Sequence, residues 1–215
     1  MPREQIELWL SAPRFKPYVD ACAGDAELAL RLYEWNAEAA AAFMELLSYL
    51  EVMLRNAIDR QFSSRSEGVL ASGNQGDRLT DGGILETAGQ ERVDEAIRRV
   101  RDQGKEPRHD RVVAALSFGF WCALLAGRYE DLWRSHLRHA FPGGDGLRRA
   151  VRSELGSILP FRNRVAHHEA IFGWDLPKQE GRQLRVISFI DPEAGSYVAS
   201  RSRVSGILES RPNLG

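Results

Sequence analysis

The 215-residue sequence contains only two cysteines and no long hydrophobic run. Cys22 and Cys122 lie beside apolar residues, and two such cysteines make neither a disulfide framework nor the spacing of a metal site. The longest apolar stretch, around 112–126, is too short and too interrupted to span a bilayer. The amino terminus, MPREQIELWL, lacks the basic-then-apolar order of a secretory signal. These absences predict a cytoplasmic protein with no membrane partner and no metal.

Lysine is also scarce, and the positive charge is concentrated in one part of the chain. Lysine supplies three of the 29 basic residues, and the formal net charge is −1. Residues 134–164 carry seven arginines against two acids, whereas residues 1–60 carry ten acids against six bases. A basic stretch within a neutral protein favours a phosphate-bearing partner. Because the sequence has no glycine-rich phosphate loop, GxSxG motif or paired-carboxylate motif, no cofactor is predicted.

Helical periodicity runs through almost the whole chain and predicts a single all-α domain over residues 1–215. Between 37 and 62, apolar residues recur at four, three, four and four positions, as one stripe of a long amphipathic helix: Phe43, Leu47, Leu50, Leu54 and Ile58. Asp25 is a predicted N-cap for a helix over 26–34, with a break or a new cap at Trp35-Asn36. Other helices are expected over 14–23, 86–103, 111–126 (capped by Asp110), 129–140, 147–160 and 194–210, with a loop at 173–182 and an extended piece at 184–190.

Residues 63–84, SSRSEGVLASGNQGDRLTDGGI, contain five glycines with repeated serine, asparagine and aspartate. This composition is typical of a long loop. The sequence predicts a segment that is partly mobile or shaped by a partner.

The segment FRNRVAHHE, residues 161–169, carries the groups best suited to chemistry. A guanidinium such as that of Arg162 binds a phosphate bidentately, and an imidazole exchanges protons near pH 7. If the segment is helical, Asn163 and His167 lie on one face, with His168 beside them as a supporting group. These residues suit attack of a ribose 2′-hydroxyl on its own phosphate. The pattern is common, however, and an Arg/His-rich helix end is equally typical of a solvated surface that complements the helix dipole.

A second cluster, Glu51, Arg55 and Asn56, lies in the long helix between apolar neighbours. Glu51 and Arg55 are four residues apart in the order that favours an intrahelical ion pair. A solvated surface pair is the plainer interpretation. The apolar flanks favour a groove between helices instead, where the cluster would orient Arg162 and His167.

Three segments in this order resemble the Abi-like (abortive infection) proteins of bacteria. Residues 32–62, with Tyr33-x-Trp35-Asn36 and Glu51-x3-Arg55-Asn56, resemble that family's long amino-terminal helix. SFGFW at 117–121 resembles its central helix, and RNRVAHHEAIF at 162–172 its terminal motif. The family is grouped with HEPN domains, which are helical bundles carrying an R-x4-6-H motif. The resemblance implies a HEPN-like bundle and a metal-independent, toxin-type RNase of phage defence, with two motifs meeting at the twofold axis of a homodimer.

Under this resemblance Arg162 and His167 match the motif ends and Asn163 its polar second residue. His167 would act as general base or acid, and Arg162 would neutralise the scissile phosphate. The implied partners are RNA, a second copy, and an antitoxin or phage-derived trigger; the expected RNA-binding residues are Arg148, Arg149, Arg152 and Arg164. Two alternatives stay open: a non-catalytic RNA-binding or partner-binding module, and a dimeric scaffold that senses a phage component through the 63–84 loop.

Overall fold

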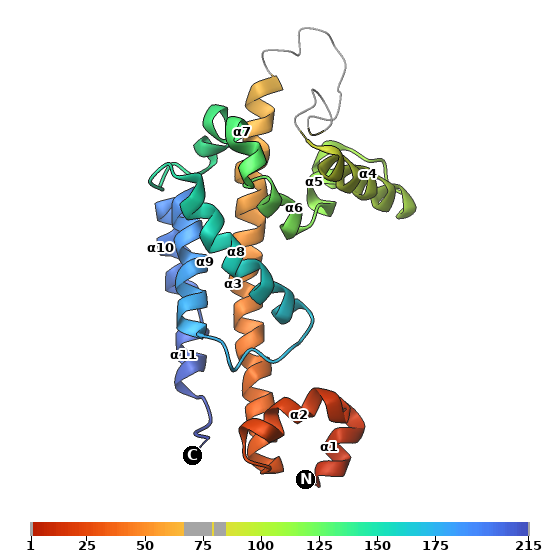
Figure 1. The fold of residues 1–215 in the computed structure, drawn as a ribbon, viewed down its shortest axis with the longest axis vertical. Coiled ribbons are helices and arrows are strands. Elements are labelled where there is room, and N and C mark those ends of the chain that lie inside the picture. The colour runs from red at the N-terminus through yellow and green to blue at the C-terminus, as the bar shows by residue number, and fades with distance from the viewer. Residues whose placement is uncertain (1, 67–78, 80–84, 215) are drawn as a thin grey trace.

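The computed structural model describes residues 2–66, Leu79 and 85–214. All regular structure in these residues is helical (Figure 1), so the predicted all-α fold is confirmed. The helices are α1 (Arg3–Leu10), α2 (Ala12–Ala21), α3 (Ala26–Ser66), α4 (Thr87–Asp102), α5 (His109–Ala115), α6 (Phe118–Ala123), α7 (Glu130–Ser135), α8 (Arg148–Ala166), α9 (Leu176–Ile190), α10 (Pro192–Arg201) and α11 (Val204–Glu209), with 3-10 helices η2 (Gly127–Tyr129) and η3 (Leu137–Ala140). Except for residues 63–66 at the end of α3 and for Leu79, the predicted 63–84 loop lies outside the described residues.

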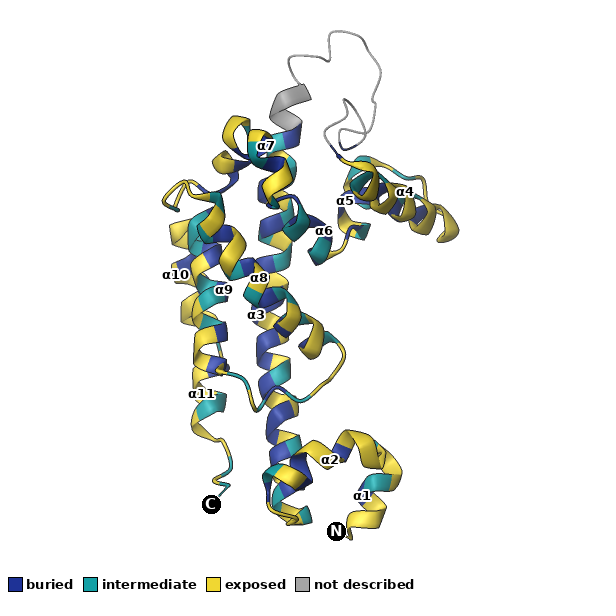
Figure 2. Ribbon diagram, in the orientation of Figure 1, coloured by how far each residue is buried: buried dark blue, intermediate teal, exposed yellow. Residues whose placement is uncertain are grey.

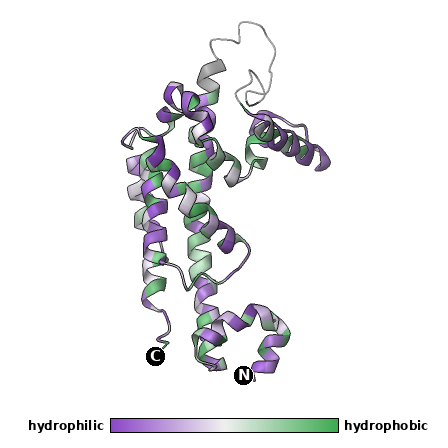
Figure 3. Cartoon of the chain, in the orientation of Figure 1, coloured by the Kyte–Doolittle hydropathy of each residue, from purple (hydrophilic) through white to green (hydrophobic). Residues whose placement is uncertain are grey.

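Helix α3 is the spine of the fold and is 41 residues long. Its predicted apolar stripe is confirmed, because all five of the stripe's side chains are fully buried. Helices α8 and α9 pack against one part of it, while α2 and α11 pack nearer its amino-terminal end. The buried residues of α3 form a continuous line facing these partners (Figure 2), and the same line is the hydrophobic side of the helix (Figure 3).

The start of α3 follows the prediction, but its continuity does not. The carboxylate of Asp25 accepts hydrogen bonds from the backbone N–H groups of Glu27 and Leu28, as an N-cap does. The predicted break at Trp35-Asn36 is wrong, since α3 runs through both residues. Trp35 instead donates its indole N–H to the carbonyl of Ile207, 2.8 Å away, and so ties α3 to α11.

Helix α8 crosses α3 diagonally, and its aromatic contacts explain where it is fixed (Figure 1). Phe161 is fully buried and meets Phe43 of α3 edge to face, with ring centroids 4.8 Å apart. Helix α8 continues through Pro160 to Ala166, six residues beyond the helix predicted over 147–160. The proline has no N–H to offer the carbonyl of Gly156, but it is exposed and so does not disturb the core.

Three other predicted elements need correction. The piece at 184–190, read as extended, belongs to α9, which begins at Leu176 inside the expected loop. Residues 111–126 form two helices, and Ser117 rather than Asp110 provides a cap, accepting from the N–H of Phe120 at 3.2 Å. The expected helix over 194–210 is divided into α10 and α11 at Ser202 and Arg203.

An ion pair between Glu45 of α3 and Arg203 provides a pH-dependent contact. The guanidinium binds both carboxylate oxygens, and this hydrogen bonding lowers the pKa of Glu45 below its ordinary value of 4.5. A lowered folded-state pKa contributes stability above the unfolded value, which is lost as the pH falls through the folded value. Glu45→Gln is therefore expected to lower Tm slightly at pH 7 and not at about pH 3. An equal Tm difference at both pH values in thermal melts would contradict this.

Candidate functional site

The candidate site is built around the carboxyl-terminal end of α8, where the core side of the helix is anchored. Ile158, Phe161 and Val165 are buried at spacings of three and four, which holds this face of α8 in the core. The opposite side is thereby turned outward, and Asn163 and His167 are both exposed. The structure therefore agrees with the prediction that these two residues lie on one face of a helix.

Arg162 is held by Glu51 of α3 rather than left free in solvent. Its Nε donates to Oε1 of Glu51 at 2.7 Å, and its Nη2 donates to Oε2 at 3.3 Å. The two side chains are about one-third exposed, at 31% and 27%. This two-point contact fixes the plane of the guanidinium. The predicted intrahelical pair of Glu51 with Arg55 is corrected, because the carboxylate of Glu51 binds across to α8. The alternative prediction, that the cluster lies between helices and orients Arg162, agrees with this contact.

The other two members of the second cluster have different environments. Arg55 is half-buried, and its Nε is buried with no hydrogen-bond partner among the described residues. Asn56 is exposed on α3. Arg55 lies one helical turn from Glu51 and has no carboxylate partner among the described residues. Its guanidinium therefore adds positive charge near the Glu51–Arg162 pair.

His167 occupies the C-cap position of α8 and is exposed. Its backbone N–H bonds the carbonyl of Asn163 at 3.0 Å, so its position is fixed by the helix. In the part of the chain that the structure describes, the imidazole has no hydrogen-bond or ion-pair partner, and no hydrogen bond joins the side chains of Arg162 and His167. A single copy therefore brings the two groups to one helix end without linking them.

His168 closes α8 in an unusual backbone conformation. Its φ of 55° lies in the left-handed region, where helices commonly place glycine. The N–H of His168 bonds the carbonyl of Val165, and the N–H of Glu169 bonds that of Arg164, which is the Schellman pattern. Arg14 of α2 donates to the carbonyl of His168. This contact from α2 fixes the turn that presents His167.

Replacing His168 with glycine is expected to stabilise the protein by a few tenths to about 1 kcal/mol. The left-handed conformation costs a non-glycine residue about 1–2 kcal/mol, which exceeds the entropic cost of glycine. Urea unfolding measures the change. His139→Gly is the matched control, because His139 is exposed in the 3-10 helix η3 and should lose stability. Equal losses of stability in His168→Gly and His139→Gly would contradict the left-handed strain at His168.

Asn36 links the middle of α3 to the chain that follows the 161–169 segment. Its side chain is 4% exposed, and its Oδ1 accepts from the N–H groups of Ile171 and Phe172 at 2.8 and 3.1 Å. The same stretch of α3 places Tyr33 against Tyr18 of α2, with ring centroids 5.1 Å apart. The Tyr33-x-Trp35-Asn36 motif therefore positions other segments around the site.

The four arginines expected to bind RNA differ in availability. Arg148 is 10% exposed and binds Glu130 at 2.6 Å and the Leu125 carbonyl, which makes it a structural contact and lowers the pKa of Glu130. Arg164 pairs with Glu169 at 3.2 Å. Arg149 and Arg152 are exposed. Of the four arginines, we therefore assign a structural role only to Arg148.

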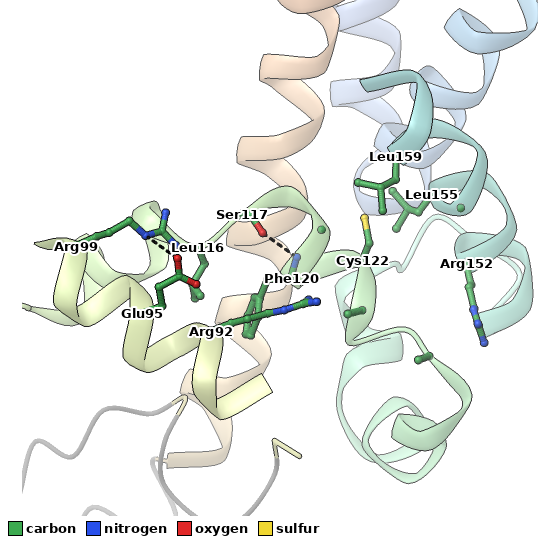
Figure 4. Close-up of a pocket in the computed structure, with 14 residues that line it drawn as sticks. Arg92, Glu95, Arg99, Leu116, Ser117, Phe120, Cys122, Arg152, Leu155 and Leu159 are labelled. Atoms are coloured by element: carbon green, nitrogen blue, oxygen red, sulfur yellow. Dashed lines mark hydrogen bonds and ion pairs between the residues drawn. The ribbon is translucent and has the colours of Figure 1, made fainter. Parts of the chain in front are cut away.

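A cleft of about 730 Å³ lies beside the site, between α4, α6 and α8 (Figure 4). Two arginines of α4, Arg92 and Arg99, line it opposite Arg152. Sequence reasoning missed the α4 pair, because it sought positive charge only at 134–164. The one available signal was the arginine density of residues 92–101.

Cys122 lines this cleft but does not suit a nucleophile. Burial, with a smaller contribution from the charge of Glu51, raises the pKa of its thiol to about 12, although the charge of Arg162 acts in the opposite direction. A thiol with so high a pKa is protonated at neutral pH, and the thiolate is the reactive form.

Comparison with known proteins identifies no relative: no family model, curated protein or solved structure matches the chain. The Abi-like resemblance therefore rests on the sequence motifs alone. In the described residues, no helix is long and apolar enough to cross a membrane. Nor do those residues contain a group of three or more His, Cys, Asp and Glu side chains placed to hold a metal ion.

Proposed function

We propose that the chain is a metal-independent endoribonuclease of the abortive-infection type, with Arg162 as phosphate ligand and His167 as proton-transfer group. The observation that carries this proposal is the Glu51–Arg162 contact, which lies at the same end of α8 as an exposed histidine. Glu51 occupies Nε and Nη2 of the guanidinium, while Nη1 has no hydrogen bond among the described residues. Arg162 is thus oriented with one donor group open, a few residues from an imidazole free to exchange protons.

The chemistry follows from these two groups. The ribose 2′-oxygen attacks the adjacent phosphorus, forming an O2′–P bond while the O5′–P bond breaks. A base takes the 2′-hydroxyl proton, and an acid gives a proton to the departing 5′-oxygen, leaving a 2′,3′-cyclic phosphate and a 5′-hydroxyl. Arg162 stabilises the added negative charge on the phosphorane. Since one imidazole serves as either base or acid, a second copy of the chain would supply the other group.

An exposed stripe on α3 supports this second copy. Small and apolar residues at spacings of four, three, four and four are all exposed on one face: Ala37, Ala41, Met44, Ser48 and Val52. Met44 and Val52 are 41% and 42% exposed, which is high for large apolar side chains. The stripe borders a cleft of about 300 Å³ that Val165 and His168 also line. A twofold contact along this face would bring the ends of two α8 helices together.

Met44→Glu is expected to convert the dimer to a monomer and to abolish cleavage, because it places a charge in the apolar contact. Light scattering at tens of micromolar measures the oligomeric state. Tyr197→Glu is the matched control, since Tyr197 is 53% exposed on α10, away from the stripe. A monomeric wild-type protein that still cuts RNA would contradict the two-copy site.

The test of the proposed function is RNA cleavage in excess EDTA by the purified protein, with the product ends identified by mass spectrometry. We expect 2′,3′-cyclic phosphate ends and no loss of rate in EDTA. Cleavage that EDTA abolishes would overturn the mechanism. RNA binding without cleavage would favour the second candidate, a non-catalytic binding module. The observation that favours this second candidate is that Glu51 already neutralises Arg162.

A further inference from the structure

The cleft between α4 and α8 has a basic rim on two sides. Arg92 reaches from α4 toward the opening, and Arg152 stands on α8 at the opposite wall (Figure 4). Both are exposed and have no ion-pair or hydrogen-bond partner in the described residues. Arg99 and Glu95 of α4 also line the cleft, with the Nε of Arg99 3.9 Å from Oε1 of Glu95, so the net charge of the lining stays positive. Unpaired arginines facing one another across a cleft suit an anionic ligand that extends between them.

The floor of the same cleft is apolar and made partly of small residues. Leu155 and Leu159 of α8 line it, together with Phe120 and Ala123 of α6. Gly156 is exposed there, and a Cβ at this position would meet no atom within 4 Å. Pro160 also leaves the carbonyl of Gly156 without its helical N–H donor. An apolar lining and an open acceptor suit an unpaired nucleobase, whereas a duplex would present only its phosphates.

The cleft is aligned with His167 along α8. Arg152, Gly156, Leu159, Asn163 and His167 follow one another at spacings of four, three, four and four, and so lie on one side of the helix. The fifteen steps along the helix from Arg152 to His167 span about 22 Å at the helical rise of about 1.5 Å per residue. In a single strand with stacked bases, successive phosphates are about 3.4 Å apart along the strand. Several nucleotides therefore cover this length.

We propose that the cleft between α4 and α8 binds single-stranded RNA and leads it along α8 to His167, with Arg92 and Arg152 on the phosphates and Leu155 and Leu159 under the bases. This inference deepens the proposed function and rests on it for the identity of the strand. It assigns a substrate-binding role to α4, a helix that contributes nothing to the Glu51–Arg162 contact. It also makes unpaired RNA the substrate class.

The test measures binding of a short fluorescein-labelled single-stranded RNA by anisotropy, in a His167→Ala background that prevents cleavage. Arg92→Ala combined with Arg152→Ala is expected to weaken binding about tenfold at low salt and to reduce the slope of log K against log salt by about 1.4, at about 0.7 per phosphate contact. The matched control is Arg101→Ala, because Arg101 is exposed on α4 about 180° around the helix from Arg92.

Gly156→Leu is the second variant, and it blocks the cleft without removing charge. Since the position has open space and leucine favours a helix over glycine, the variant should fold at least as stably as the parent. Weaker RNA binding with an unchanged melting temperature supports the inference. Binding equal to that of the parent in both variants overturns it. Equal affinity for a duplex, or for a single nucleoside monophosphate, also overturns the strand assignment.

The failure of this inference is distinguishable from the failure of the proposed function. If the protein with an intact His167 cuts RNA in EDTA and the Arg92/Arg152 variant binds like its parent, only the cleft assignment is wrong. If the intact protein never cuts RNA but the cleft variants lose binding, the cleft assignment stands and the nuclease does not.

Discussion

His167→Ala is expected to reduce the rate of RNA cleavage by about 10²–10⁴-fold, the usual contribution of a positioned acid or base. The same change should alter the free energy of unfolding by less than about 0.5 kcal/mol, because an exposed side chain with no partner is removed. His167 is exposed at the end of α8 and has only backbone hydrogen bonds in the described structure. Single-turnover cleavage with urea unfolding of the same samples measures both quantities.

Two further histidine variants make this result specific. His139→Ala removes an exposed imidazole from η3, away from α8, and should leave the cleavage rate unchanged. His168→Gly removes the neighbouring imidazole while easing the left-handed turn. If His168→Gly abolishes cleavage and His167→Ala does not, the proton-transfer group is His168, which is the next position allowed by the motif spacing. Unchanged cleavage in both His167→Ala and His168→Gly would exclude the end of α8 from the mechanism.

Asn36→Ala is expected to lower the free energy of unfolding by about 2–4 kcal/mol. The change leaves the N–H groups of Ile171 and Phe172 without an acceptor, and each such buried donor costs about 1–3 kcal/mol. Alanine is the better helix former, so helix propensity would act in the opposite direction. Urea unfolding with an unchanged m-value measures the loss.

Asn36→Asp is the matched variant, because a carboxylate oxygen can accept the same two hydrogen bonds. It should lose less stability than Asn36→Ala at pH 7. A loss under about 0.5 kcal/mol for Asn36→Ala would place Asn36 among ordinary surface positions and contradict the contact. A large stability loss in Asn36→Ala would also show that the Tyr33-x-Trp35-Asn36 motif stabilises the fold around the site.

The long central helix was predictable because its pattern is local. Five apolar residues at helical spacing determined which face of α3 is buried, and the structure buries all of them. Asp25 was recognisable as a cap for a similar reason, since its hydrogen bonds reach only two and three residues along the chain. The outward placement of Asn163 and His167 also follows from α8 alone.

Contacts between distant segments were not predictable from spacing. Glu51 has an apparent partner four residues away in Arg55, but its carboxylate binds Arg162, 111 residues distant. The apolar flanks of the cluster indicated this contact, whereas its spacing did not. Asn36 resembled a cap or break because asparagine is common at helix ends, yet its side chain holds a segment 135 residues later. In both cases the tertiary partner decides the role of a polar side chain that local rules assign elsewhere.

The error at 184–190 has a similar origin. Val186, Ile187 and Ile190 favour strands by propensity, and the alternation over a few residues is weak. In the structure the buried residues of α9 are spaced as on a helix, and α9 packs against α3, α8 and α10. Packing on three neighbouring helices outweighs the preference of β-branched residues for extended backbone. Arg92 and Arg99 were missed because only the fold brings α4 opposite α8.

The measurement that tests the central claim most directly uses two matched oligonucleotides. One is a DNA strand with a single ribonucleotide, and the other has the same sequence with no ribonucleotide. In EDTA, the proposed mechanism predicts cleavage of the first strand only, immediately after the ribonucleotide, with a 2′,3′-cyclic phosphate end and loss of cleavage in His167→Ala. Cleavage of the all-deoxy strand, or cleavage of the first strand that His167→Ala leaves unchanged, would contradict the account.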